Sequence, residues 1–501
     1  DVKQLYNDAL AKYQGKEYVA SLAILDNLAQ LTPDWLRPFL LRAYILRNQG
    51  NFVSELQVLQ KLLEDAAIKE KTNILSEGDR AVVAEAWSLL GVACVTLGEC
   101  RLGVDAFLHS VVNEVSWEKK LVEQSNAIFA ANYCANLKKE EWLNLYQGYR
   151  ELLSNIQPVS LKRYQHSKVR VGYLSGDIRM HAVAWFLRPL LEHHNRERFQ
   201  VYIYKVNEES DLVTEGLCAN AEYTREVSDC SDIEICQVIQ SDEIDILIDL
   251  SGHTCGNKLH IFAYKPAPIL LSGIGYFNST GLAIDGFLSD VFCSPVGKHS
   301  EYIEPLIQLP MTHFCYQPWY EIPPVAKEMA WQKNGYITFG CFNNFSKVTD
   351  EMLTTWNRIL QACPNSRLRL KHKLFDSEEG RKWTKDRMDK LHLPLNRIEF
   401  KGFSAGHMWE YQEIDIALDT FPYVGGLTTC EALIMGVPVV SLYGSRHGTR
   451  FGFSFLSNID LTELAVTEKE AYVKVVVALA QDKELLLWLH HNLRAKVEHS
   501  P

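Results

Sequence analysis

The sequence predicts an α-helical, tetratricopeptide-like N-terminal region followed by α/β structure in two Rossmann-like lobes. Three observations support this: helical periodicity with a 34-residue repeat up to about residue 115, strand–helix alternation from Lys168, and a second alternating run after the Pro-bearing segment 318–324. At 501 residues the chain is long enough for about three domains. The predicted boundaries are 1–115 for the repeats, 116–165 for a helical linker region, 166–320 for the first lobe and 321–501 for the second.

The repeat is clearest in two aromatic residues that open successive helices. Tyr18 and Phe52 stand 34 positions apart, and a third unit occupies Gly91 to Val112, after the polar stretch Lys69 to Asp79. A plain helical bundle is the alternative, but period and positions together favour stacked repeats. Such stacks usually hold another chain, so the sequence predicts a protein partner, and the short stack could also serve dimerisation or docking.

Composition excludes several classes of function. The formal net charge of −11 argues against binding a nucleic-acid backbone. The sequence contains no run of about 18 apolar residues, so it predicts no membrane span. The twelve cysteines form no CxxC pair, which predicts no disulfide framework, no zinc site and a reducing cytoplasm. The chain starts at Asp1 without a signal-peptide pattern, from which we expect a shortened N-terminus.

The stretch from Asp415 to Gly452 predicts a strand, a glycine-bearing turn and a helix. Ile416 to Leu418 form a short apolar run, Gly425 and Gly426 free the backbone, and a helix begins near Thr428. Unpaired N–H groups at a helix N-terminus suit a phosphate. Any strand–Gly–Gly–helix corner has this appearance, so the glycines alone leave a structural role equally open.

Strand ends of the first lobe carry polar or glycine-bearing corners. Ligands in doubly wound sheets bind beyond the carboxyl ends of strands, so these corners predict one wall of a cleft. The expected strands are 169–174, 199–204, 244–250 and 269–276, and the corners are 175–181, 251–254 and 275–276.

Strand ends of the second lobe carry further candidates. The expected strands are 336–342, 368–372, 398–400, 416–418 and 439–442. Lys347, just beyond the first of them, could meet a diphosphate or be a surface lysine. His407 could stack on a base or cap a helix, and His181 could position a substrate, act as a base or serve as a cap. Two such lobes in series predict a ligand held between them.

These motifs together resemble a known family. Residues 168–501 are similar to the catalytic region of O-linked N-acetylglucosamine transferases, in the bacterial and plant SPINDLY-like branch, which also carries tetratricopeptide repeats ahead of that region. The matching stretches are VRVGYLSGDIRMHAV, DLSGHTCGNKLHIFAYKPAPI, FGCFNNFSKVTDEMLTTWNRIL and LDTFPYVGGLTTCEALIMGVPVVSLYGSRHGTR.

The resemblance implies a GT-B glycosyltransferase with an inverting mechanism, no cofactor and no metal. It implies UDP-N-acetylglucosamine as the donor and Ser or Thr of a protein as the acceptor, with bacterial flagellin as the candidate protein. His181 and Asp177 would lie beside the reacting sugar, and Lys347 would bind the diphosphate with Asn344 beside it. His407 would stack on uracil. The remaining nucleotide contacts implied are Gly275, Ser404, Gly425, Gly426, Leu427, Thr428, Thr429 and, for the ribose, Glu431.

Several positions depart from the family pattern. Leu427 stands where the family often has His or Thr, Ser404 stands where the vertebrate type has a lysine near the uracil, and the loop Gly275 to Thr280 is bulkier near the expected sugar pocket. The family usually continues past Pro501 into a last helix. Two alternatives therefore stay open: the same fold with GDP-fucose or UDP-glucose as donor, and a non-catalytic scaffold. A homo-oligomer is also possible.

Overall fold

A computed structural model describes residues 1–72, 74–297 and 302–501. The chain forms two compact units, each discussed separately below. The first comprises residues 1–136, 344–357 and 370–404, and the second comprises residues 137–343, 358–369 and 405–501. In the described chain, no helix is both long and apolar enough to cross a membrane.

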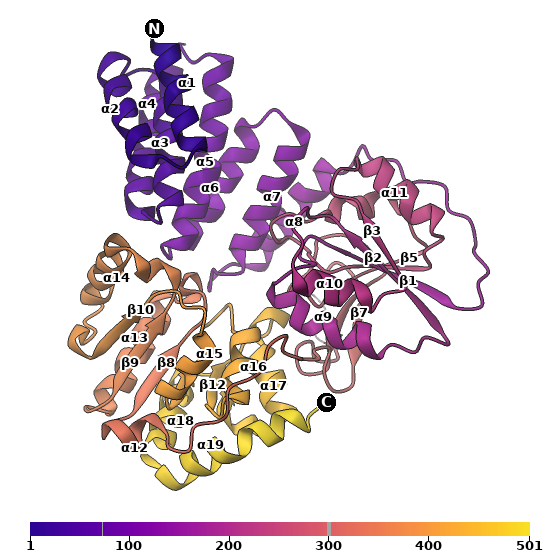
Figure 1. The fold of residues 1–501 in the computed structure, drawn as a ribbon, viewed down its shortest axis with the longest axis vertical. Coiled ribbons are helices and arrows are strands. Elements are labelled where there is room, and N and C mark those ends of the chain that lie inside the picture. Colours follow the sequence, from indigo (N-terminus) through magenta and orange to yellow (C-terminus); the bar gives the residue numbers. More distant parts are fainter. Residues whose placement is uncertain (73, 298–301) are drawn as a thin grey trace. The chain divides into compact units, whose positions relative to one another are not determined.

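The N-terminal region is entirely helical, as its periodicity predicts (Figure 1). Tyr18 and Phe52 are the first residues of α2 and α4, so the 34-residue period marks equivalent helix starts. The polar stretch expected between Lys69 and Asp79 is shorter than predicted, because α4 continues to Lys71 and α5 already begins at Glu77. The helices are α1 (Val2–Gln14), α2 (Tyr18–Leu31), α3 (Leu36–Asn48), α4 (Phe52–Lys71), α5 (Glu77–Thr96), α6 (Cys100–Asn113), α7 (Trp117–Ala131) and α8 (Lys139–Leu152).

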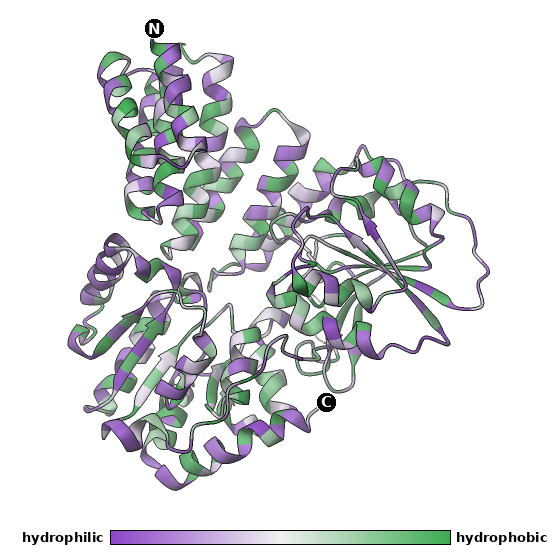
Figure 2. Ribbon diagram, in the orientation of Figure 1, coloured by the Kyte–Doolittle hydropathy of each residue, from purple (hydrophilic) through white to green (hydrophobic). Residues whose placement is uncertain are grey.

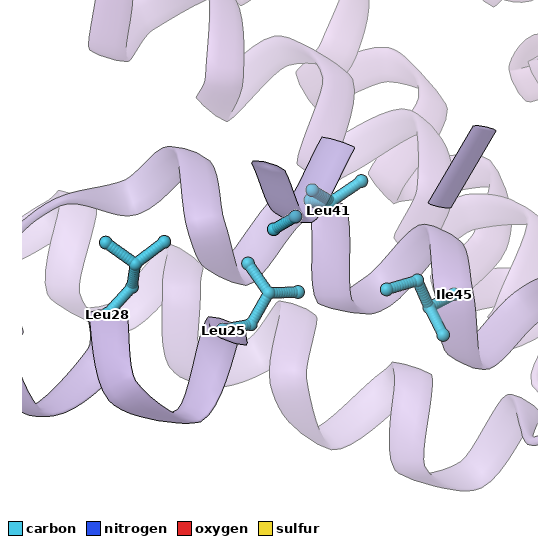
Figure 3. Close-up of a cluster of buried hydrophobic side chains, with 5 residues drawn as sticks. Leu25, Leu28, Leu41 and Ile45 are labelled. Atoms are coloured by element: carbon cyan, nitrogen blue, oxygen red, sulfur yellow. The ribbon is translucent and has the colours of Figure 1, made fainter. Parts of the chain in front are cut away.

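Apolar stripes on these helices meet in the interior of the stack. Figure 2 shows hydrophobic and hydrophilic residues alternating along them. Leu25 and Leu28 of α2 pack with Leu41 and Ile45 of α3, and each of these side chains is at most 4% exposed (Figure 3). Burying one such leucine contributes about 2 kcal/mol, so each repeat is stabilised mainly by the helix beside it.

The first lobe is a seven-stranded, all-parallel sheet in the order β3-β2-β1-β4-β5-β6-β7. From β1 the chain adds strands first towards one edge of the sheet and then, from β4 on, towards the other. This switch between β1 and β4 is where a doubly wound sheet leaves its ligand crevice. The elements are β1 (Val169–Ser175), α9 (Ala182–His193), β2 (Phe199–Lys205), α10 (Leu212–Ala219), β3 (Tyr223–Glu226), α11 (Asp232–Ser241), β4 (Ile246–Asp249), η1 (Leu259–Tyr264), β5 (Ile269–Ser272), β6 (Gly286–Asp290) and β7 (Leu306–Leu309).

The second lobe has a six-stranded sheet in the order β10-β9-β8-β11-β12-β13, the same winding with its reversal between β8 and β11. Its elements are α12 (Ala330–Asn334), β8 (Thr338–Cys341), η2 (Phe345–Lys347), α13 (Asp350–Ala362), β9 (Arg367–Lys371), η3 (Lys373–Asp376), α14 (Glu378–Lys390), η4 (Leu395–Arg397), β10 (Ile398–Lys401), α15 (His407–Glu410), η5 (Tyr411–Glu413), β11 (Ile416–Leu418), α16 (Leu427–Ile434), β12 (Val439–Leu442), η6 (His447–Thr449), α17 (Phe451–Ser457), η7 (Thr462–Leu464), β13 (Ala465–Val466), α18 (Lys469–Gln481) and α19 (Lys483–Glu498).

The predicted strands all exist, but several are shorter than expected. β5 ends at Ser272, so the expected run to Tyr276 includes a turn in which Gly273 and Ile274 both have positive φ. The sequence reading missed β3, β6, β7 and β13. β3 is the short polar edge strand YTRE, and β7 lies between Pro305 and Pro310, so neither shows an apolar alternation.

Candidate active site

The corner between β11 and α16 is held by one buried carboxylate. Asp419 is 2% exposed, and its Oδ1 accepts hydrogen bonds from the backbone N–H of Thr420 (2.9 Å) and of Gly425 (2.8 Å). Its Oδ2 accepts from the hydroxyl of Ser441 on β12 at 2.6 Å. Burial raises the pKa of this carboxyl group, and the donors around it oppose that effect. Asp419 thereby fixes the loop that leads to the helix N-terminus.

Asn343, two residues beyond the end of β8, connects the two central strand ends of this sheet. Its Nδ2 donates to the hydroxyl of Thr420 at 2.8 Å and to Asp419 at 3.2 Å, while its Oδ1 accepts from the hydroxyl of Thr428. The sequence analysis did not select Asn343 as a site residue, although its position after a strand end was the available signal. It lies at the reversal between β8 and β11, where a ligand crevice is expected.

The helix N-terminus begins where predicted. Gly426 caps α16, Leu427 is its first residue, and Thr428 and Thr429 lie in its first turn. A Cβ on Gly425 would lie 2.6 Å from Oγ1 of Thr429 and 2.9 Å from Oγ1 of Thr428, so this position has room only for glycine. The first turn of α16 thus offers unpaired N–H groups to an anion, while the Thr428 hydroxyl already donates to Asn343.

Glu431, expected at the ribose, is already bonded within the protein. It is 2% exposed, its Oε1 lies 3.0 Å from Nε2 of His407 and 3.2 Å from the Tyr320 hydroxyl, and its Oε2 accepts from Tyr411 at 3.1 Å. Tyr320 and Tyr411 were not foreseen as neighbours of the carboxylate. His407 is the first residue of α15, and its side chain is one-third exposed. Its bond to Glu431 fixes the orientation of the ring.

Lys347 and Asn344 lie together on the short turn η2 after β8. Asn344 caps this turn, its Oδ1 accepting from the N–H of Ser346 at 3.1 Å, and its carbonyl accepts from the N–H of Lys347 at 2.9 Å. Ser404 belongs to the same compact unit, where its hydroxyl accepts from Nζ of Lys371 at 3.0 Å. Lys371 is a buried cation beside Ser404. Position 404 is where the vertebrate type of the family has a lysine.

In the first lobe, His181 and Asp177 share the corner between β1 and α9. His181 is the N-cap of α9, and its Nδ1 accepts from the N–H of Val183 at 3.3 Å while lying 3.8 Å from Oδ2 of Asp177. Burial lowers the pKa of His181, so the ring is neutral near pH 7. With Nδ1 as an acceptor, Nε2 carries the proton and acts as a donor, so this tautomer fits orientation of a substrate oxygen better than proton removal.

Gly275 and the loop after it are fixed by packing. A Cβ on Gly275 would lie 1.7 Å from the carbonyl oxygen of Leu250, the residue that follows β4. Ser279 and Thr280 are fully buried and both donate to Glu304. The bulk noted in this loop is therefore buried. Phe277 is buried as well, and the centre of its ring lies 4.3 Å from that of Tyr423.

The β4 corner contains a buried histidine, His253, that the sequence analysis did not single out as a site residue. Its Nε2 donates to the carbonyl of Thr280 at 2.7 Å, and its ring meets Tyr149 edge to face. Burial lowers its pKa to about 4. Because the unfolded chain takes up a proton near pH 6.5 and the folded chain does not, this group reduces stability as pH falls from about 6.5 towards 4.

We expect His253 to lower the free energy of unfolding by about 2 kcal/mol at pH 5 relative to pH 7.5. The melting temperature of His253→Gln should consequently fall less between these pH values than that of the wild type. His499→Gln, which changes an exposed histidine, should keep the wild-type slope. Equal slopes for His253→Gln and wild type would contradict this assignment.

Asp290, Cys293 and His313 form the one group in the described chain whose ligand atoms lie within 4.8 Å of one another in the manner of a metal site. Asp290 already accepts from His313 Nδ1 at 2.6 Å, from the Ser454 hydroxyl, and from the backbone N–H groups of Phe292, Cys293 and His313. Burial and Asp290 raise the pKa of the Cys293 thiol well above its ordinary value. A metal would have to displace these bonds, so the group is better explained as packing between β6 and α17.

Comparison with known proteins agrees with this architecture. The model of a family described as glycosyl transferase family 41 matches residues 155–334 and 325–501. A probable UDP-N-acetylglucosamine–peptide N-acetylglucosaminyltransferase SPINDLY from Arabidopsis thaliana is 36% identical over 341 residues, and one from Solanum lycopersicum is 33% identical over 389 residues. These matches cover 66% and 75% of this chain but only 37% and 42% of the relatives.

The solved structures include a close match in fold. An O-GlcNAc transferase variant from Thermobaculum terrenum has a TM-score of 0.84 and 27% identity, covering 99% of this chain and 93% of that one. The helical repeat region and the two parallel-sheet lobes of GT-B type predicted from the sequence are thereby confirmed. Since the family model covers both lobes, the chain belongs to glycosyl transferase family 41.

Proposed function

We propose that this chain is a protein O-glycosyltransferase that transfers N-acetylglucosamine from UDP-N-acetylglucosamine to Ser or Thr of a protein acceptor. The observation that carries the proposal is the Asn343–Asp419–Thr428 corner, which holds a helix N-terminus rigidly at the strand reversal of the second sheet. The names of the SPINDLY relatives support the donor and the peptide acceptor. Flagellin stays a proposed acceptor, and the repeats are the proposed surface that holds it.

In this proposal the pyrophosphate binds at the first turn of α16, and the ammonium of Lys347 meets the charge that develops as UDP departs. Groups aimed at developing charge stabilise the transition state more than the ground state, and a cation together with N–H donors does so without a metal. The acceptor hydroxyl attacks C1 of the sugar from the face opposite the departing UDP. The new C1–O bond forms as the C1–O bond to the diphosphate breaks, which inverts the configuration, and the hydroxyl proton is released to water. His181, beside Asp177, donates from Nε2 to orient the reacting groups.

The nucleoside is assigned to the surroundings of Glu431. The bond from Nε2 of His407 to Glu431 fixes the orientation of the imidazole ring, and this ring is proposed to stack on the uracil. Glu431 must share its oxygens with Tyr320 and Tyr411 if it also binds the ribose. Lys371, held against Ser404, is proposed to supply the positive charge near the base that a lysine at position 404 would otherwise supply.

We expect UDP at a hundred times its Kd to stabilise the native chain by about 2.7 kcal/mol and to raise its melting temperature by several degrees. The same concentration of GDP should have a much smaller effect, and EDTA should change neither result. A larger shift with GDP than with UDP would contradict the uridine assignment and favour a GDP-sugar donor.

The sugar and the acceptor are tested together by incubating the chain with a candidate protein and a panel of donors. Mass spectrometry of the protein should show a mass increase only with UDP-N-acetylglucosamine. Transfer from GDP-fucose or UDP-glucose instead would replace the proposed donor, and absence of transfer from every donor, with no nucleotide binding, would support a scaffold.

A further inference from the structure

The turn between α5 and α6 of the repeats contacts the segment that carries Lys347, within the same compact unit. Cys100, the first residue of α6, is 8% exposed, and its thiol donates to the carbonyl of Ser346 at 3.7 Å. Burial raises the pKa of this thiol to about 12, so it stays protonated and able to donate. The repeat region thus touches the residue immediately before Lys347.

Arg387 of α14 binds this segment on the other side. Its Nη2 donates to the carbonyl of Val348 at 2.8 Å, and its Nε donates to the carboxylate of Asp350 at 2.6 Å. Its guanidinium also lies 5.9 Å from the centre of the Phe345 ring. Three residues that flank Lys347 are therefore held by one rigid, planar cation.

The repeat turn and α14 are fitted to each other around Arg387. Gly98 has a φ of +90°, and a Cβ there would lie 2.8 Å from Nη1 of Arg387, so the guanidinium occupies space that any other residue would fill. The neighbouring Leu97 carbonyl accepts from Nε1 of Trp383, one turn before Arg387 on α14. The glycine lets the two elements approach, and the indole fixes their register.

We propose that Arg387, packed against Gly98 of the repeats, is a positioning residue for Lys347, so that the repeat region sets the geometry of the donor site as well as holding the acceptor. This inference rests on the proposed function, in which Lys347 binds the diphosphate. The physical reason is that a lysine ammonium on a flexible stem is useful only where its backbone is fixed. Phe345, 3% exposed against Phe375, fixes one end of the turn, and Arg387 fixes the other.

The test is a double-mutant cycle on the full chain, with the Kd of UDP measured by calorimetry and no acceptor present. Arg387→Ala alone should weaken UDP binding about tenfold, and Lys347→Ala alone should weaken it more than Arg387→Ala does. In a chain that already carries Lys347→Ala, adding Arg387→Ala should change the Kd less than twofold, because a positioning residue has nothing left to position. Arg387→Lys should recover only part of the affinity, since it cannot bind Val348 and Asp350 together.

A matched control separates positioning from general attachment of the repeats. Ser54 of α4 also bonds to α14, through its hydroxyl and N–H to Glu379, and neither of these bonds involves the Lys347 segment. Ser54→Ala should therefore leave the Kd of UDP within twofold of wild type. On the repeat side, Gly98→Val should weaken the binding of UDP as much as Arg387→Ala does. Far-ultraviolet circular dichroism should show that this variant retains its helix content.

The outcomes distinguish this inference from the proposed function. If Lys347→Ala binds UDP as wild type does, the proposed function fails. If Lys347→Ala weakens UDP binding but Arg387→Ala does not, only the positioning role is overturned. The same holds if the fold-changes in Kd of the two single variants multiply in the double variant. Equal weakening by Ser54→Ala and Arg387→Ala would likewise reduce the contact to a structural attachment.

Discussion

Lys347→Ala should lower the turnover of sugar transfer about a hundred- to a thousand-fold, or roughly 3–4 kcal/mol in activation free energy. The reason is the charge that UDP gains on departure, which the ammonium meets in a site partly shielded from water. The melting temperature should stay at the wild-type value, because Lys347 is half-buried on a three-residue turn and is not part of a hydrophobic cluster. Turnover at saturating donor and a melting curve measure the two expectations.

Two further variants make the lysine prediction specific. Lys347→Arg should not restore full activity, because the planar fork cannot place its charge where a compact ammonium does. Lys333→Ala, which removes an exposed lysine on α12, should transfer sugar at the wild-type rate. Wild-type turnover in Lys347→Ala would refute the mechanism proposed above, whatever the similarity to family 41.

Gly425→Ala should abolish most donor binding, raising the KM for the nucleotide sugar about a hundredfold. The new methyl group would have to share space with the hydroxyls of Thr428 and Thr429 and with Oδ1 of Asn343, which lies 3.1 Å away. Relieving these contacts turns the first helical turn away from the pyrophosphate by a distance on the order of an ångström, which is enough to cost two orders of magnitude. Initial rates against donor concentration give the KM.

The neighbouring glycine provides a contrast for this prediction. A Cβ on Gly426 would have Phe451 at 3.9 Å as its nearest neighbour, which is an ordinary van der Waals contact. Gly426→Ala should therefore raise the KM far less than Gly425→Ala. The reverse order, or equal effects, would mean that loop flexibility rather than the space around Gly425 governs donor binding.

The outline of the fold and the position of the α16 corner could be predicted from local signals. A repeat of 34 residues, buried apolar strands and a Gly-Gly turn each reflect backbone geometry within a few residues, and local sequence encodes that geometry directly. The carboxyl ends of parallel strands meet at one sheet edge, so polar residues after the strands could be assigned to a site before any contact was known. The roles given to the catalytic and nucleotide-binding residues came from the family resemblance and stay predictions.

What the tertiary structure alone decided is which distant side chains meet. Asn343 bonds to Thr428 across 85 positions, Glu431 is occupied by Tyr320, Tyr411 and His407, and Leu97 bonds to Trp383 across 286 positions. From sequence, the repeats had only the roles of holding a partner, dimerising or docking, because no local pattern shows that Gly98 leaves room for Arg387. Pairings of this kind depend on how helices and sheets pack after the chain has closed long loops. That packing is settled by the whole set of buried surfaces and not by residues near in sequence.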